Sequence, residues 1–177
     1  ALKWNCTLKP LDNPKYVLNS TGLKLTLLPK HKKTIDAFAN VKHTERNIYS
    51  KAFEYATENG FDEALVLNEN NTIADASIYN VFTVKDGNIY TPPLTDAPVA
   101  GVLRELLLTR LPAGRIIEKS ISIQDIYNAD ELFLTNALKG IRWVGYMDDK
   151  QLGNTITKQI FEEFKSIVAE HFGEHLV

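Results

Sequence analysis

The stretch DASIYNVFTVKDGNIYTPP, residues 75–93, carries the clearest fold signals in this sequence. Val81 to Lys85 and Asn88 to Tyr90 are short runs of residues that favour strands. Between them, Asp86-Gly87 can adopt the positive φ values of a type I′ turn. Pro92-Pro93 ends the second run, because proline cannot donate a hydrogen bond to a sheet ladder. We therefore predict a β-hairpin here.

A surface hairpin explains everything after Tyr79, but not the two polar residues in front of it. Asp75 and Asn80 bracket the sequence ASIY just ahead of a strand that we predict to be buried. A buried carboxylate is unstable without a cation or strong hydrogen-bond donors. The sequence therefore predicts a cationic partner for Asp75.

Outside this stretch, apolar periodicity and turn residues predict most of the remaining elements. Residues 2–11, LKWNCTLKPL, are expected to form a strand, and residues 10–33 a polar connector around one β-prone run, Leu23 to Leu28. Lys30 to Lys33 is interpreted as a solvated basic cluster. The further predictions are a helix from about Asn47 to Gly60, a strand over Glu63–Asn68 buried on both faces, a helix starting at Asp96 to Pro98, a strand over Arg115–Ile121, a short helix after a capping box at Ser122, and an amphipathic helix over Ile156–Phe172.

Composition excludes several classes of function. With 177 residues the chain suits one domain, and its 20 Lys plus Arg against 22 Asp plus Glu argue against a nucleic-acid partner. Cys6 is the single cysteine, so an internal disulfide is excluded and a cytoplasmic location is the expectation. The sequence has no apolar run long enough for a membrane span and does not begin with a signal-peptide pattern.

The polar and aromatic residues of the opening stretch resemble a known family motif. Asp75, Asn80, Val81-Phe82 and Thr91-Pro92-Pro93 stand where the fold-type-IV pyridoxal-phosphate enzymes carry an acidic residue, Asn, a hydrophobic pair and Thr-Pro-Pro. That family contains the class-IV aminotransferases and the aminodeoxychorismate lyases, and it usually has Glu in place of Asp75. Gly60 to Ala64 and Ala129 to Phe133 also match the family's runs.

This resemblance implies an α/β fold, a curved mixed sheet or pseudo-barrel with peripheral helices. It implies that residues 1–33 connect to a missing amino-terminal domain and that residues 34–177 bind the cofactor. It further implies pyridoxal phosphate as cofactor, a small-molecule amino substrate and a homodimer, without a nucleic-acid or membrane partner.

The resemblance also implies which residues form the site. Lys42, just ahead of the first helix, stands at the position of the Schiff-base lysine, which must lose its proton to react. Asp75 is the expected partner of the pyridine nitrogen, and Tyr49 could face the cofactor ring. Gly101-Val102-Leu103-Arg104 corresponds to a phosphate-binding Gly-Ile-Thr-Arg motif, where helix amino-terminal N–H groups of Val102 and Leu103 would hold the anion.

The resemblance also implies a second phosphate contact from Thr135, Asn136 and Ala137, in a loop that runs to Leu138. Asp130 and Glu131 permit a metal or acid–base reading, but neighbouring strand residues point to opposite faces. His171 and His175 have metal-ligand spacing without a third ligand, so no metal site is predicted.

Two reactions suit these residues, and a third alternative involves no chemistry. The Thr135 to Leu138 sequence, TNAL, is more similar to the lyase branch than to the Gly-Thr-Ala loop of branched-chain aminotransferases, so 4-amino-4-deoxychorismate lyase is favoured. A branched-chain or D-amino-acid aminotransferase is the alternative. A non-catalytic fragment that retains the fold is the third.

Overall fold

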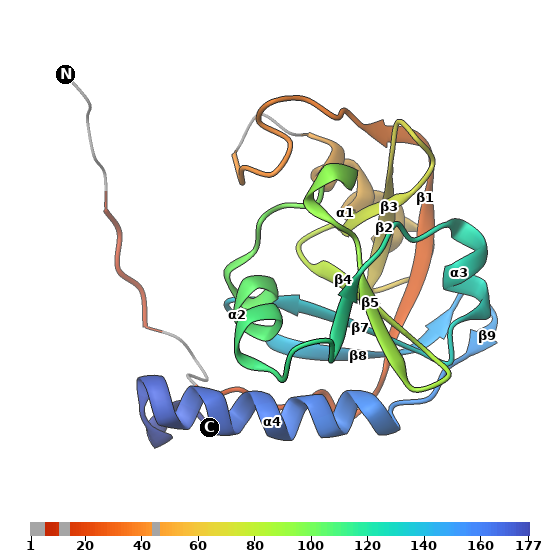
Figure 1. Cartoon of the computed structure of the whole chain (residues 1–177). Helices are drawn as coiled ribbons and strands as arrows, with labels where there is room; N and C mark the ends of the chain where they lie inside the picture. The colour runs from red at the N-terminus through yellow and green to blue at the C-terminus, as the bar shows by residue number, and fades with distance from the viewer. Residues whose placement is uncertain (1–5, 11–14, 44–46) are drawn as a thin grey trace.

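The computed structural model describes residues 6–10, 15–43 and 47–177 and contains a curled mixed sheet with helices around it (Figure 1). The strands are ordered β3-β2-β1-β8-β7-β4-β5-β6, and β9 pairs with β8. The strands are β1 (Leu23–Lys33), β2 (Glu63–Asn68), β3 (Ile73–Ala76), β4 (Asn80–Lys85), β5 (Asn88–Thr91), β6 (Ile116–Glu118), β7 (Glu131–Asn136), β8 (Gly140–Met147) and β9 (Lys150–Gln151). The helices are α1 (Ile48–Glu58), α2 (Val102–Arg110), α3 (Ile123–Asn128) and α4 (Thr155–Phe172), with 3₁₀ turns η1 (Leu94–Asp96) and η2 (Glu174–Leu176).

The predicted hairpin is confirmed as β4 and β5. Thr83 pairs with Tyr90 and Lys85 with Asn88, so the loop contains two residues. These are Asp86 and Gly87, with φ values of 49° and 77°, as a type I′ turn requires. The right-handed twist of such a turn matches the twist of the strands that it joins.

The predicted fold class, a curved mixed sheet with peripheral helices, is also confirmed. β1 runs parallel to β2 and to β8, while β7 is antiparallel to β4 and β8. β1 continues to Lys33, beyond the predicted end at Leu28, so the last part of the expected connector lies inside the sheet. The strand expected over residues 2–11 is wrong for the described part, because residues 6–10 are exposed and irregular. Residues 2–5 and 11 lie outside the described residues.

Apolar side chains from the two faces of the sheet form separate clusters. Inside the curl, side chains from β1, β2, β4, β7 and β8 pack together, among them Leu25, Leu65, Val81, Leu134 and Val144. On the outside, α2 and α4 cover β4 and β7 with a second cluster around Phe82 and Phe133, whose rings stack at 4.7 Å. A third cluster lies between α1 and strands β1 and β2.

α1 and α3 begin and end close to where their sequences predict, but the helix expected to start at Asp96 to Pro98 begins only at Val102. Leu94–Asp96 forms a separate 3₁₀ turn instead, and Ala97 ends it with a φ of 64°. The buried residues of α1 are Ile48, Ala52 and Ala56, spaced by four, and Gly60 follows with a φ of 78°. The predicted capping box of α3 is confirmed: the Ser122 hydroxyl accepts from the Asp125 amide, and the Asp125 carboxylate accepts from the Ser122 amide. Among the described residues no helix is long and apolar enough to cross a membrane.

Candidate active site

Asp75 lies at the centre of a buried hydrogen-bonding cluster near the end of β3. Asp75 is 2% exposed. Oδ1 accepts from the Asn80 side-chain amide at 2.9 Å, and Oδ2 accepts from the Tyr49 hydroxyl at 2.7 Å. The Val99 amide donates to Oδ2 at 3.0 Å. These donors come from β4, α1 and the loop ahead of α2, so three separate parts of the chain meet at one carboxylate.

The predicted cation is present, and it is Lys33. Its Nζ lies 3.0 Å from Asp75 Oδ2, and the two side chains are 0% and 3% exposed. Lys33 Nζ also donates to the Tyr49 hydroxyl, which in turn donates to Asp75. The interpretation of Lys33 as part of a solvated cluster is therefore wrong, although its neighbours His31 and Lys32 are exposed.

Sequence patterns missed Lys33 because an irregularity in β1 changes the direction of its side chain. The pairing of β1 with β2 shifts register between Leu27 and Lys32, and Lys30 has a φ of 64°. A bulge of this kind exchanges the two faces of a strand, so Lys33 leaves the face of Leu25 and Leu27 and points to the opposite face, where Asp75 and Tyr49 lie. Without knowing the bulge, four basic residues in a row favour a solvated segment.

Asn80 connects Asp75 to the loop that precedes α2. Its side-chain amide donates to the Val99 carbonyl at 2.8 Å as well as to Asp75. Gly101, the residue before α2, approaches so closely that an added Cβ would lie 2.0 Å from Asn80 Oδ1. Glycine at position 101 therefore permits the amino terminus of α2 to lie beside the Asp75 cluster.

The amino terminus of α2 has the geometry expected for an anion site. Gly101 has extended backbone angles and its carbonyl accepts the first helical hydrogen bond, from the Glu105 amide at 3.0 Å. The N–H groups of the first turn, at Val102 and Leu103, have no acceptor within an α-helix. The Val102 side chain is 75% exposed and the Leu103 side chain is in the core, so the backbone is the part available to a ligand.

Thr135, Asn136 and Ala137 lie at the end of β7, although a loop was predicted over them. Thr135 and Asn136 belong to the strand, because they pair with β8 and Thr135 also pairs with Asn80 of β4. Thr135 is 0% exposed, and its hydroxyl has no hydrogen-bond partner among the described residues. Directly opposed residues share one face of an antiparallel sheet, so Thr135 faces the same side as Asn80. Asn136 Oδ1 accepts from the Leu138 and Lys139 amides, which closes the turn after β7.

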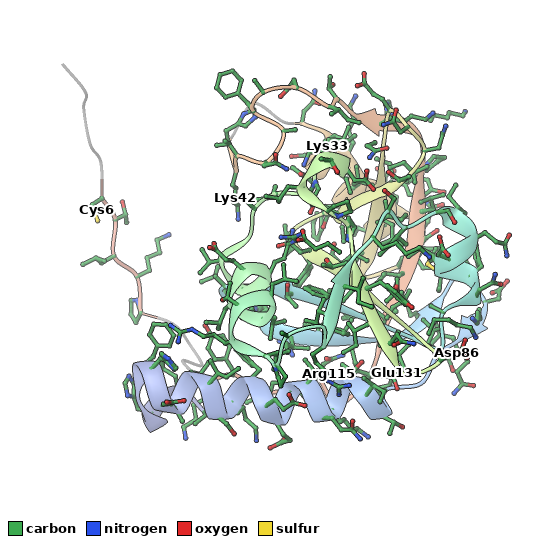
Figure 2. The ribbon with its side chains drawn as sticks, viewed as in Figure 1. Cys6, Lys33, Lys42, Asp86, Arg115 and Glu131 are labelled. Atoms are coloured by element: carbon green, nitrogen blue, oxygen red, sulfur yellow. The ribbon has the colours of Figure 1, made fainter. Side chains whose placement is uncertain are left out.

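Lys42 is exposed, and it is not among the described donors to the Asp75 carboxylate (Figure 2). The segment just before it is attached to the loop ahead of α2. The Asn40 side chain donates to the carbonyls of Leu94 and Pro98, and its own carbonyl accepts from the Ala100 amide at 2.8 Å. Residues 44–46, which follow Lys42 in its motif, lie outside the described residues.

The acidic pair Asp130 and Glu131 has structural roles. The Asp130 carboxylate accepts a hydrogen bond from the Asp86 amide and pairs with Lys85 at 2.9 Å, and these two contacts lower the pKa of Asp130. Glu131 is buried and accepts from the amides of Ile156 and Thr157 at 2.8 Å, which caps α4 (Figure 2). Among the described residues no group of three ligand-type side chains could hold a metal ion.

A second buried acid, Glu63, lies at the start of β2. Its residue is 4% exposed, and burial raises its pKa to about 7, although hydrogen bonds from the Ser77 hydroxyl and amide act in the opposite direction. Sequence patterns gave no signal for the Glu63 carboxyl. Glu63 is followed by apolar residues, so it was interpreted only as the first residue of a buried strand.

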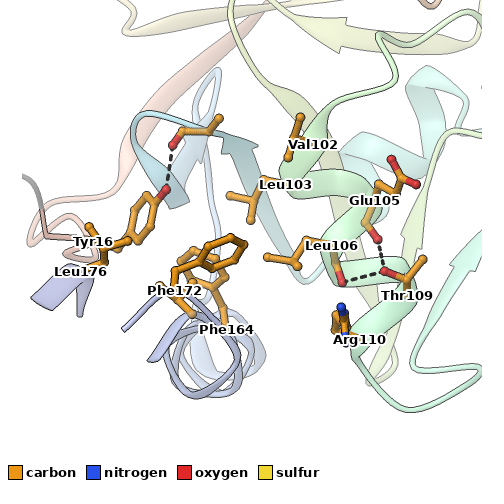
Figure 3. Close-up of a pocket in the computed structure, with 12 residues that line it drawn as sticks. Tyr16, Val102, Leu103, Glu105, Leu106, Thr109, Arg110, Phe164, Phe172 and Leu176 are labelled. Atoms are coloured by element: carbon orange, nitrogen blue, oxygen red, sulfur yellow. Dashed lines mark hydrogen bonds between the residues drawn. The ribbon is translucent and has the colours of Figure 1, made fainter. Parts of the chain in front are cut away.

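An apolar pocket of about 440 Å³ separates α2 from α4 (Figure 3). Val102, Leu103 and Ala137 line it, together with aromatic side chains such as Tyr16 and Phe164. The Tyr16 hydroxyl donates to the Ala137 carbonyl at 2.8 Å, which ties the segment before β1 to the turn after β7. None of the residues around Asp75 lines this pocket, so it is separate from the buried charged cluster.

Comparison with known proteins assigns the chain to a family. The sequence profile of the amino-transferase class IV family matches residues 3–145. The branched-chain-amino-acid aminotransferase of Pseudomonas aeruginosa is 34% identical over 104 residues, which covers 58% of this chain and 34% of that protein.

Solved structures agree on the fold. The branched-chain amino acid aminotransferase from Escherichia coli superimposes with a TM-score of 0.76 at 25% identity, covering 86% of this chain and 54% of that one. The 4-amino-4-deoxychorismate lyase from Pseudomonas aeruginosa gives a TM-score of 0.73 at 24% identity, covering 86% and 56%. The chain spans about two fifths of the length of the curated relatives that it matches, 39% and 40% for two of them.

Proposed function

The chain belongs to the amino-transferase class IV family, and on that premise we propose that it is part of a pyridoxal-phosphate-dependent enzyme acting on a substrate amino group. The observation that carries this proposal is the buried carboxylate of Asp75, held beside a glycine-preceded helix amino terminus. The Asp75 carboxylate suits a cationic ring nitrogen, and the amino terminus of α2 suits a phosphate. When bound, the cofactor supplies an electron sink for the bonds at the substrate's amino-bearing carbon.

The described residues fit this cofactor in three places. Asp75 is acidic, buried and oriented by Asn80 and the Val99 amide, so it could keep a ring nitrogen protonated. The first-turn amides of Val102 and Leu103 could hold the phosphate. The buried Thr135 hydroxyl, which has no partner within residues 6–10, 15–43 and 47–177, faces the side of the sheet that Asn80 and Gly101 share, and it could donate to the same group.

Asp75 is shorter by one methylene than the Glu usual in the family, and the structure offers a compensation. The Val99 amide and the Asn80 side chain draw the loop ahead of α2 onto Asp75. The shorter side chain of Asp75 therefore occurs together with a close approach of the backbone at Val99. We propose that this arrangement keeps the carboxylate within hydrogen-bonding distance of the ring.

We propose Lys42 as the residue whose amine attaches the cofactor and then moves protons at the substrate carbon. Asn40, two residues before it, is hydrogen-bonded to Pro98 and Ala100. Two residues span about 7 Å at most, so the Lys42 backbone is tethered near Gly101. Its exposed side chain has the length to turn toward the site from there.

We favour transamination of an amino acid, with branched-chain amino acids tested first. The support is the name carried by curated relatives that are about a third identical, such as that of Pseudomonas aeruginosa. Lyase activity on 4-amino-4-deoxychorismate is the second candidate, supported by the Thr135 to Leu138 sequence. We propose the homodimer that the family resemblance implies for either reaction, which sedimentation velocity would test.

The deciding experiment records the visible absorbance of the protein after pyridoxal phosphate is added. Under this proposal an absorbance band forms, and leucine, isoleucine or valine converts it to the pyridoxamine form. A band that survives every amino donor, with release of pyruvate from 4-amino-4-deoxychorismate, would support the lyase instead. Lys42→Ala is expected to abolish the band, whereas Lys158→Ala, an exposed lysine on α4, should leave it unchanged. Absence of a band in the unchanged protein would contradict the proposal.

A further inference from the structure

The ion pair between Lys33 and Asp75 is the most deeply buried charge contact in the described residues. The side chains are 0% and 3% exposed, and Nζ lies 3.0 Å from Oδ2. Nζ also lies 5.1 Å from the centre of the Tyr49 ring, so an aromatic face covers it on one side. A charge in such surroundings is stable only while its partner remains.

The carboxylate of Asp75 has its hydrogen-bonding positions filled. Oδ1 accepts from Asn80, and Oδ2 accepts from Lys33, Tyr49 and the Val99 amide. Of these four donors only Lys33 is a cation on a long flexible stem. Asn80 and Val99 are held by the sheet and by the loop ahead of α2, so they cannot leave without wider rearrangement.

We propose that Lys33 is a displaceable counter-ion, which neutralises Asp75 in the cofactor-free chain and withdraws from Oδ2 when a cationic pyridine ring binds. This inference rests on the proposed function, because it assumes that the ring nitrogen meets Asp75. A protonated ring nitrogen and the Lys33 ammonium carry the same charge and need the same oxygen. One must leave for the other to bind, so Lys33 competes with the cofactor and lowers its affinity.

The same geometry separates the two lysines of the site by role. The Lys33 Nζ is already engaged by the Asp75 carboxylate at 3.0 Å and by the Tyr49 hydroxyl, so these contacts fix its position. Lys33 is therefore a positioning residue for Asp75, and the attachment of the cofactor is left to Lys42. Lys33 therefore determines how tightly the ring is bound and takes no part in the chemical reaction.

The test replaces the cation and measures binding of a ring that cannot form a covalent bond. The probe is 4′-deoxypyridoxine phosphate, which keeps the pyridine ring and phosphate and has no aldehyde. Lys33→Met should melt about 6 °C or more below the unchanged chain without the probe, because Asp75 loses its cation. It should bind the probe at least tenfold more tightly by calorimetry. Lys32→Met, the exposed neighbour on β1, is the matched control and should match the unchanged chain in both measurements.

Two further measurements keep the inference testable if Lys33→Met does not fold. Lys33→Gln retains a hydrogen-bond donor without the charge and should also bind the probe more tightly than the unchanged chain. In the unchanged chain, trace acetylation followed by mass spectrometry should show Lys33 becoming more reactive when the probe is added, while Lys158 does not change.

The outcomes separate this inference from the proposed function. If the unchanged chain does not bind the probe and forms no absorbance band with pyridoxal phosphate, the proposed function fails. If it binds the probe but Lys33→Met or Lys33→Gln binds it equally or more weakly, the counter-ion role is overturned while the function stands. Borohydride reduction that leaves the cofactor on Lys33 rather than Lys42 would also overturn it.

Discussion

Glu63 should make the stability of this fold depend on pH in a direction opposite to that of most acidic residues. Burial raises its pKa from 4.5 to about 7, so the folded chain holds a proton that the unfolded chain has released. A carboxyl with a raised pKa contributes stability below its unfolded pKa, and that stability is lost as the pH rises through the folded value. The window therefore runs from about pH 4.5 to pH 7.

The size of the effect follows from the shift. One pKa unit corresponds to about 1.4 kcal/mol, so a shift of roughly two and a half units corresponds to about 3 kcal/mol between pH 4 and pH 8. Glutamine at position 63 has no charge to desolvate and can still accept from the Ser77 amide. In Glu63→Gln we expect this part of the pH dependence to disappear, so that at pH 8 the variant is more stable than the unchanged chain.

Urea unfolding at half-unit steps from pH 4 to pH 8 measures this directly, with the free energy of unfolding obtained by linear extrapolation. Other ionisable groups contribute equally to both proteins, so the difference between the two curves isolates Glu63. Glu58→Gln, at an exposed position on α1, is the control and should parallel the unchanged chain. Parallel curves for Glu63→Gln, within about 0.5 kcal/mol at every pH, would refute the reasoning, since surface substitutions already vary by that amount.

Three further predictions concern other buried contacts. Glu131→Ala removes the carboxylate that caps α4 and should lower the free energy of unfolding by about 2–3 kcal/mol, measured in urea. Gly101→Ala places a Cβ 2.0 Å from Asn80 Oδ1, so we expect a loss of about 1–3 kcal/mol and at least tenfold weaker binding of 4′-deoxypyridoxine phosphate. The hydrogen bond to Asp148 raises the pKa of Tyr127 to about 12; Asp148→Asn should restore its ionisation to near pH 10, seen by ultraviolet titration.

Elements governed by neighbouring residues could be predicted from the sequence. The Asp86-Gly87 hairpin, the capping box at Ser122 and the stripe of α1 were all recognised, because turn geometry and helical spacing act over a few residues. The need of Asp75 for a cation was also predictable, since a charge ahead of a buried strand must be neutralised.

Tertiary structure alone decided which residues meet that need. Lys33 is 42 positions from Asp75 in the chain, and it points to the face of the sheet where Asp75 lies only because β1 shifts register beside β2. Glu131 likewise caps a helix that begins more than twenty residues later, and Thr135 lies in a strand because β4 and β8 pair on either side of it. The sequence by itself determined the local elements and the charge that had to be compensated. Which lysine compensates it depends on sheet register and burial, which arise only when distant segments pack together.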